Sequence, residues 1–348
     1  MSVPIELRPP LSRAKIMQSW AWLRHPLARP LGALALLLLV DLFAVPGFFR
    51  LDLKDGHLYG SLVDIANRAA PLMLAALGMT LVVATRGIDI SVGAVVALAG
   101  TVGAMLVGPG AASHVPFGLA LGAAMGAALL CGAWNGVRVA TLGLQPIVAT
   151  LILMVAGRGL AQLLTDGQIV TVYYPPYFFL GGGYLAGLPF SLFGVAFVFA
   201  ITALLMRKTA LGLFIRAVGI NPVAARLAGI RTSNLVFFAY LFCGACAGMA
   251  GLMISSNIKS ADANNAGLLL ELDAILAVTL GGTSLAGGRF SLAGSVIGAL
   301  IIQTLTYTIY LLGVPPEVNM VVKSVVVFAV CISQSPQLGK VFRRGRLA

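Results

Sequence analysis

Long apolar stretches follow one another along almost the whole chain, and they constrain its fold more than any other feature. Ten stretches come close to the length of about 20 residues that a helix needs to cross a bilayer. They run over residues 30–48, 69–85, 90–108, 116–137, 145–164, 190–206, 234–254, 270–286, 291–312 and 318–335. Only 10% of the 348 residues are charged, whereas an average soluble domain has about 25%. The sequence therefore predicts an all-α fold, a polytopic transmembrane helix bundle of about ten spans.

The net charge of +12 would favour a nucleic-acid partner if the protein were soluble. The cations, however, gather in the N-terminal tail, in a loop at 207–231 and in the C-terminal tail. Because Lys and Arg collect on the cytoplasmic side of membrane proteins, this pattern predicts that both termini are cytoplasmic. We therefore expect membrane lipid, and no nucleic acid, around a transmembrane domain at 30–335, with cytoplasmic tails at 1–29 and 336–348.

The loop at 207–231 contains a predicted short helix. Asn221 is a good N-cap, Pro222 suits the first helical position, and Gly229 suits the left-handed residue after a helix end. Such a helix of about two turns is too short to be stable alone, so it should pack against another surface. The alternative is an ordinary surface helix held by its own chain.

Small residues are frequent in the apolar stretches. The 41 glycines exceed the usual share of about 7%, and they predict close helix approach inside a bilayer. The four cysteines also lie in apolar runs, so we expect packing rather than redox or metal chemistry. They are Cys131, Cys243, Cys246 and Cys331.

Motifs for bond chemistry are absent from the sequence. There is no G-x-x-x-x-G-K-[ST] motif to cradle nucleotide phosphates, and the three histidines are scattered. Neither H-E-x-x-H nor a nucleophile elbow occurs. We therefore expect no enzyme activity, no catalytic residues, no metal and no cofactor bound by this chain.

Two charged residues near membrane depth are candidates for function, because an ionised group at the bilayer centre costs about 2.5–3.5 kcal/mol. Arg158 lies two thirds along the fifth stretch, between two glycines. It either lines a wet pathway or satisfies neighbouring carbonyls. Asp89 precedes Ser91 at the start of the third stretch, where it can cap a helix or pair with Arg86.

A further polar cluster precedes and enters the eighth stretch. It contains Asn264, Asn265, Glu271 and Asp273. Amides and carboxylates hydrogen-bond hydroxyl groups, so a sugar or polyol fits this chemistry, and a cation fits it as well. The residue types alone leave both ligands open.

Two longer runs carry a resemblance to a known family. One extends from Asn67-Arg-Ala-Ala-Pro71 to Gly87-Ile-Asp-Ile-Ser-Val-Gly93, and the other is Thr279-Leu-Gly-Gly-Thr-Ser-Leu-Ala-Gly-Gly-Arg289. Both resemble the permease subunits of ribose-type sugar ABC importers, over about residues 60–335. Three further stretches, at 144–159, 167–170 and 261–267, are most similar to permeases of the galactofuranose type.

The resemblance implies a permease that carries a monosaccharide across the bacterial inner membrane. The expected sugar is galactofuranose, or otherwise a ribose-, galactose- or xylose-like sugar. A separate cytoplasmic ABC ATPase would use the ATP, a periplasmic sugar-binding protein would deliver the sugar, and a second permease subunit, identical or related, would complete the pathway. The candidate pathway residues are Asn67, Asp89, Gln145, Arg158, Asn264, Asn265, Glu271 and Asp273.

The resemblance also implies that the segment at 221–229 docks on the ATPase. The candidate coupling residues are Arg216, Asn221, Pro222, Arg226 and Gly229. The sequence Arg216-Ala-Val-Gly219 stands where many other importers carry a Glu of E-A-A type.

Two other classes of function stay open. A stand-alone ion- or proton-coupled carrier would use Asp89, Arg158, Glu271 and Asp273 as relay groups. A membrane enzyme acting on lipid-linked sugars would need clustered acids or metal ligands, and the sequence has few clustered acids and no metal-ligand pattern.

Overall fold

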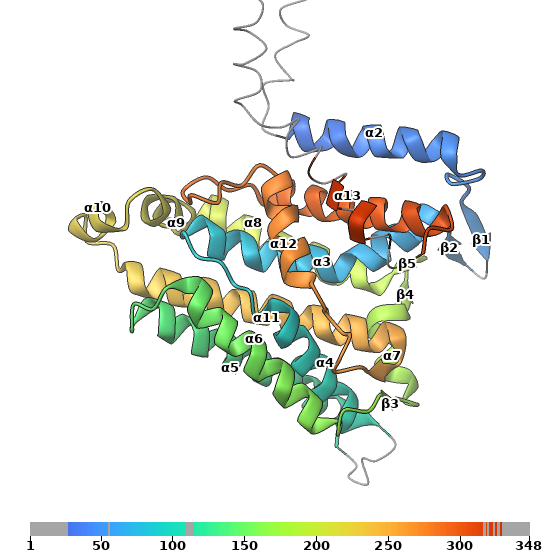
Figure 1. Ribbon diagram of the computed structural model, residues 1–348, viewed down its shortest axis with the longest axis horizontal. Helices are drawn as coiled ribbons and strands as arrows, with labels where there is room; N and C mark the ends of the chain where they lie inside the picture. The colour runs from blue at the N-terminus through green and yellow to red at the C-terminus, as the bar shows by residue number, and fades with distance from the viewer. Residues whose placement is uncertain are drawn as a thin grey trace, which may run out of the picture.

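The structure is a computed structural model that describes residues 27–54, 56–108 and 115–315, with isolated residues between 318 and 328. The predicted tails lie outside these residues, apart from 27–29. The described part of the chain forms twelve helices, and most of them contribute to one apolar core. Figure 1 shows most of the long helices running side by side along the long axis of the molecule.

Most of the helices are long and apolar, and a few short helices lie between the later ones. They are α2 (Ala28–Ala44), α3 (Ser61–Ala84), α4 (Val92–Val107), α5 (Phe117–Ala140), α6 (Pro146–Leu164), α7 (Pro175–Gly182), α8 (Phe190–Lys208), α9 (Leu211–Ile220), α10 (Pro222–Leu227), α11 (Thr232–Ile258), α12 (Leu270–Leu280) and α13 (Leu292–Leu311). Within the described residues, α3, α5, α6, α8, α11 and α13 are long and apolar enough to cross a membrane. The expected bundle of apolar helices is therefore present, with six described helices of the length and composition that a membrane span needs.

A helix overlaps each of the first nine predicted stretches, but two predictions need correction. The stretch predicted at 270–286 forms only the 11-residue α12, which at 1.5 Å per residue covers about half of a 30 Å bilayer core. It ends because Gly281 and Gly282 follow, and Gly282 adopts φ +85°. The second stretch begins at Ser61 rather than 69, so Arg68 lies inside a helix. Most of 318–335 lies outside the described residues, and the count of ten spans stays a prediction.

Helix α11 lies at the centre of the bundle, packed on α3, α4 and α5. Glycines permit these close approaches: a Cβ added at Gly244 would lie 2.7 Å from the carbonyl oxygen of Ala128 in α5. A Cβ at Gly251 would collide with the carbonyl oxygen of Val96 in α4. The predicted packing role of glycine is confirmed here, and Cys131, Cys243 and Cys246 are buried free thiols. Cys331 lies outside the described residues.

Two helix pairs, α3–α4 and α12–α13, are each interrupted by a non-helical break. Residues 85–91 separate the first pair and residues 281–291 the second. The pairs contact each other where the Thr80 hydroxyl donates to the Ser295 hydroxyl over 2.7 Å. These breaks bring non-helical backbone into the bundle, which is tolerated at membrane depth only where protein or water surrounds it.

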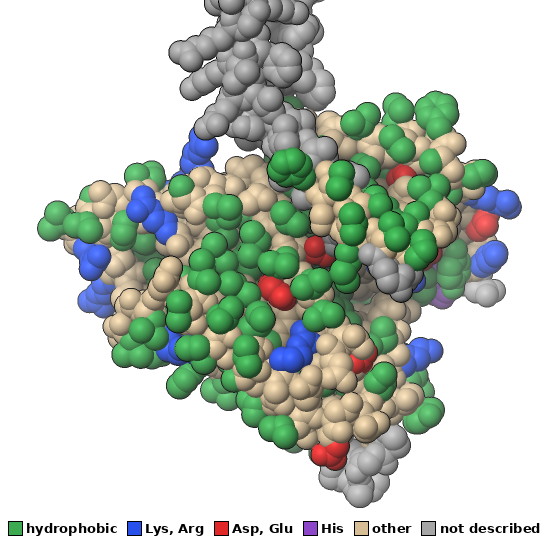
Figure 2. All heavy atoms as spheres, in the orientation of Figure 1, with side chains coloured by type: hydrophobic (Ala, Val, Ile, Leu, Met, Phe, Trp, Pro, Cys, Tyr) green, Lys and Arg blue, Asp and Glu red, His purple; other side chains and the backbone are tan. Residues whose placement is uncertain are grey.

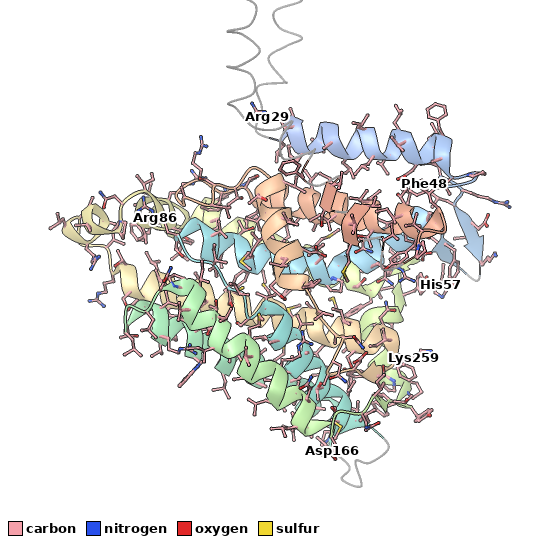
Figure 3. The ribbon with its side chains drawn as sticks, viewed as in Figure 1. Arg29, Phe48, His57, Arg86, Asp166 and Lys259 are labelled. Carbon is pink, nitrogen blue, oxygen red and sulfur yellow. The ribbon has the colours of Figure 1, made fainter. Side chains whose placement is uncertain are left out.

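Short connectors occupy the two ends of the bundle. In Figure 1, α9 and α10 lie at one end, while the hairpins β1 (Asp52–Lys54) with β2 (His57–Tyr59) and β4 (Tyr184–Leu185) with β5 (Leu188–Pro189) lie at the other. The registers pair Asp52 with Tyr59 and Tyr184 with Pro189. A third pair joins β3 (Val170–Thr171) to β6 (Ser260–Ala261). Figure 3 labels Arg86 near the end that carries α9 and Lys259 toward the opposite end.

Candidate substrate pathway and coupling segment

Arg158 projects from α6 onto the loop that precedes α12. Its Nη1 donates to the carbonyl oxygens of Ala266 over 2.7 Å and Ala263 over 3.0 Å. One helical turn further along α6, Gln162 Nε2 donates to Asn264 Oδ1 over 2.8 Å. Two side chains of α6 therefore hold this loop. Of the two interpretations of Arg158, the contacts fit the one in which it satisfies neighbouring carbonyl groups.

The loop is shaped internally by Asp262. Its Oδ1 accepts hydrogen bonds from the backbone N–H groups of Asn264 over 3.1 Å and Asn265 over 3.0 Å. Its Oδ2 accepts from Asn265 Nδ2 over 3.0 Å. Partial burial raises the pKa of the Asp262 carboxyl, but these hydrogen bonds outweigh it and hold the pKa below its ordinary value. Asp262 is thus an ionised anchor for the turn that presents the two exposed amides.

Glu271 lies where this loop meets α4. Its side chain is 7% exposed, and a Cβ at Gly93 would collide with its Oε2. The carboxylate therefore sits against the first turn of α4, where the positive end of the helix dipole favours a negative charge. Among the described residues, Oε2 has no hydrogen-bond partner. Arg158 is close enough to attract this carboxylate.

These groups form one polar region on a largely apolar face. We define the loop cluster as Arg158, Gln162, Asp262, Asn264, Asn265 and Glu271. Figure 2 shows a few blue and red side chains among green ones on the face formed by α4, α6 and α12. Exposed leucines border the cluster on the same loop and on α12, namely Leu268, Leu269 and Leu272. The arrangement can present amides and one guanidinium to a polar solute.

Asp89 belongs to a different and enclosed site. It is 2% exposed, and its Oδ1 accepts from Ser91 N over 3.0 Å and Ser91 Oγ over 2.6 Å. Asn135 of α5 donates to the Ser91 hydroxyl over 2.8 Å. Asp89 therefore shapes the end of the α3–α4 break through Ser91, the residue before α4, but among the described residues no side-chain hydrogen bond caps α4 itself. The expected pairing with Arg86 is wrong, because the left-handed backbone at Arg86 turns its side chain toward α9.

The remaining pathway candidates lie apart from the loop cluster. Asn67 lines a pocket of about 240 Å³ with Arg68, Asn257 and Gln303, and it contacts the Ser191 hydroxyl. Gln145 is exposed at the start of α6, at the end opposite to Gln162. Asp273 is half-buried on α12, two residues beyond Glu271. The structure thus brings together Arg158, Asn264, Asn265 and Glu271, but not Asn67, Asp89 or Gln145.

The short helix predicted within 207–231 is present as α10. Asn221 Oδ1 accepts from Val223 N over 3.0 Å and from Ala224 N over 3.1 Å, which confirms the N-cap. Pro222 is the first helical residue, and Gly229 adopts φ +82° after the helix. Arg226 Nε donates to Pro222 O over 3.2 Å from an exposed position, and Arg216 of α9 lies over the Phe290 ring.

Residues 61–331 match the family described as the branched-chain amino acid transport system / permease component. The chain belongs to this family.

Individual relatives in this permease family are named for sugars. The chain is 54% identical to the galactofuranose transporter permease protein YtfT of Escherichia coli (strain K12), over 90% of this chain and 91% of that protein. It is 39% identical to the fructose import permease protein FruF of Bifidobacterium longum (strain NCC 2705), over 82% and 80% of the two chains. It is 37% identical to the ribose import permease protein RbsC of Escherichia coli (strain K12), over 91% and 96%. The resemblance inferred from the motifs is confirmed. No solved structure matches this permease.

Several residues of the permease that shape these sites were missed from sequence. Gln162 follows Arg158 by four positions on one helix, a spacing that places both side chains on the same face. Asn135 is a polar residue within the apolar α5, which by itself marks a candidate site. Gly93 belongs to one of the family motifs, but its contact with Glu271 gave no signal, because Glu271 is distant in sequence.

Proposed function

We propose that this chain is the permease subunit of an ABC importer that carries a monosaccharide, with galactofuranose the first candidate, across the bacterial inner membrane. The observation that carries the proposal is the 54% identity to a galactofuranose transporter permease over 90% of the chain. The printed family description refers to amino acids, but the relatives compared above are named for three different sugars. Galactofuranose is therefore preferred over the family's amino-acid cargo.

The loop cluster supports a sugar as cargo. Two exposed amides and the guanidinium of Arg158 offer hydrogen-bond donors and acceptors that match hydroxyl groups. Only Nη1 of Arg158 is engaged with the loop carbonyls in the contacts above, so its other nitrogens can face a solute. The chain would guide the sugar without any bond chemistry.

The exposed α10 supports a partner that supplies energy. It projects at one end of the bundle with Leu227 87% exposed, and a water-exposed leucine of this kind suits a protein interface. A cytoplasmic ABC ATPase would dock there and use ATP, so that its motion favours different arrangements of the permease. A periplasmic binding protein would deliver the sugar, and a second permease, identical or related, would complete the pathway within the lipid.

Reconstitution tests the proposal directly. The permease is placed in lipid vesicles with its ATPase and binding protein, and uptake of radiolabelled galactofuranose is measured with ATP or a non-hydrolysable analogue. We expect uptake only with ATP and with the binding protein. Ribose and fructose, offered in parallel, rank the cargo.

A control distinguishes the proposed importer subunit from the main alternative, a stand-alone carrier. The permease alone is placed in vesicles with an ion or proton gradient and no ATPase. Uptake under these conditions would show a stand-alone carrier and would contradict the proposal.

A further inference from the structure

Three segments far apart in sequence meet at one point beside α10. They are the end of α3 at Ala84 and Arg86, the end of α9 at Gly219 and Ile220, and the turn at Gly287 and Gly288 between α12 and α13. The backbone N–H of Gly288 donates to Ala84 O over 3.0 Å. We call these three segments the junction.

Arg86 fastens the first segment of the junction to the second. Its Nε donates to Gly219 O over 2.6 Å, and its Nη2 donates to Ile220 O. These carbonyls end α9, where the last C=O groups of a helix lack internal partners and the dipole favours a cation. One side chain therefore satisfies two helix-terminal carbonyls with charge-assisted hydrogen bonds, the stronger class of such bonds.

Glycines bring the backbones of the junction into direct contact. A Cβ at Gly219 would collide with Ala84 O and Gly288 N, and a Cβ at Gly287 would lie 2.5 Å from Arg86 Cγ. Gly287 and Gly288 adopt φ +84° and +81°, a region that favours glycine. At Gly219 the three backbones touch without a side chain between them, so a displacement of one segment should carry the others with it.

The junction connects the exposed helix to both broken helix pairs. Ile220 is followed at once by Asn221, which caps α10. Arg86 is followed by the break that ends at Ser91 and α4, whose first turn lies against Glu271. The turn at Gly287 follows α12, which begins with Leu270 and Glu271. A displacement of α10 would thus reach Glu271 from both sides.

We propose that Arg86 is a positioning residue that links the coupling helix to the α3–α4 and α12–α13 breaks and thereby transmits motion to the loop cluster. This inference rests on the proposed function, because the motion would come from the ATPase docked on α10. A charged side chain on helix-end carbonyls suits this role, because its charge strengthens the hydrogen bonds while the side chain of Arg86 stays exposed. Figure 3 labels Arg86 in this region of the bundle.

The test compares Arg86→Met and Arg86→Lys in the complete reconstituted complex. The readout is the ratio of galactofuranose imported to ATP hydrolysed. A variant that only lowers the amount of assembled complex would leave this ratio unchanged. For Arg86→Met we expect normal ATP hydrolysis and a ratio lower by about tenfold, the effect of losing about 1.4 kcal/mol of coupling. Arg86→Lys keeps the charge but not the two-pronged geometry, so its ratio should fall between that of Met and that of wild type.

Two controls keep the outcome decisive. Arg207→Met removes an exposed cation of α8 on the same side of the bundle and should leave the ratio unchanged. Wild-type uptake with ATP establishes the proposed function independently, so its absence would count against that function and not against Arg86. An unchanged ratio in an assembled Arg86→Met complex would overturn the inference. Failure of both Arg86 variants to assemble would also overturn it, because Arg86 would then serve the fold alone.

Discussion

The Nη1 of Arg158 lies 2.7 Å from the carbonyl oxygen of Ala266, although the two residues are 108 positions apart in the chain. This contact joins α6 to the loop before α12, and it makes the geometry of the loop cluster depend on one guanidinium.

Replacing Arg158 with Met should loosen the loop. Hydrogen bonds to charged groups contribute about 1.5–3 kcal/mol each, so we expect a lower unfolding temperature in detergent and at least a tenfold loss of sugar uptake. Leu163→Met is the matched control on α6, because Leu163 is 74% exposed on the same helix. Equal unfolding temperatures for the Arg158 and Leu163 variants would contradict the prediction.

Gly298→Ala should separate α12 from α13. A Cβ at Gly298 would collide with the carbonyl oxygen of Ala277, whereas a Cβ at Gly122 on α5 has nothing within 4 Å. Overpacking costs about 1–3 kcal/mol, so thermal unfolding should occur earlier for Gly298→Ala than for Gly122→Ala. If both variants unfold at the same temperature, the prediction that α12 and α13 approach closely at Gly298 is wrong.

Glu271→Gln distinguishes a structural carboxylate from a proton relay. Gln keeps the shape but removes the charge that faces the first turn of α4, an interaction of about 0.3–2 kcal/mol. We expect slightly lower stability and ATP-driven uptake that is retained with an unchanged pH profile. Complete loss of uptake together with a loss of its pH dependence would instead favour the stand-alone proton-coupled carrier.

Leu227→Ala should weaken docking of the ATPase on α10. Truncating a central apolar anchor commonly costs about 2 kcal/mol, so the affinity of the permease for the ATPase should fall by at least tenfold. The control is Leu185→Ala in the β4–β5 hairpin at the opposite end of the bundle, which should leave the affinity unchanged. Equal affinities for the two variants, measured by titration in nanodiscs, would exclude α10 as the docking site.

Single cysteines introduced at Leu227 and Gly187, in a background with the four native cysteines replaced, should report opposite sides of the membrane. A thiol reagent that does not cross membranes should label Gly187→Cys in intact spheroplasts, and Leu227→Cys only after the membrane is opened. The cation distribution predicts this result. Labelling of both sites in intact spheroplasts would refute the predicted orientation.

The sequence by itself determined the helices of this protein, because their formation depends on residues that are close together in the chain. The apolar stretches located the long helices, because helix length and hydropathy are local properties that a bilayer selects. Asn221, Pro222 and Gly229 located α10 for the same reason, since caps act within one turn. The frequency of glycine indicated close packing, but not which backbones approach each other.

Only the tertiary structure decided the contacts between distant segments. Arg86 lies three residues from Asp89 in sequence, yet its side chain binds Gly219 and Ile220, because its left-handed backbone directs it toward α9. Likewise, α12 proved shorter than its apolar stretch, and Arg158 acquired its partners from a loop that only the folded bundle brings to α6. Hydropathy sets where a helix can lie, whereas the partner of a buried polar group depends on which helices pack beside it.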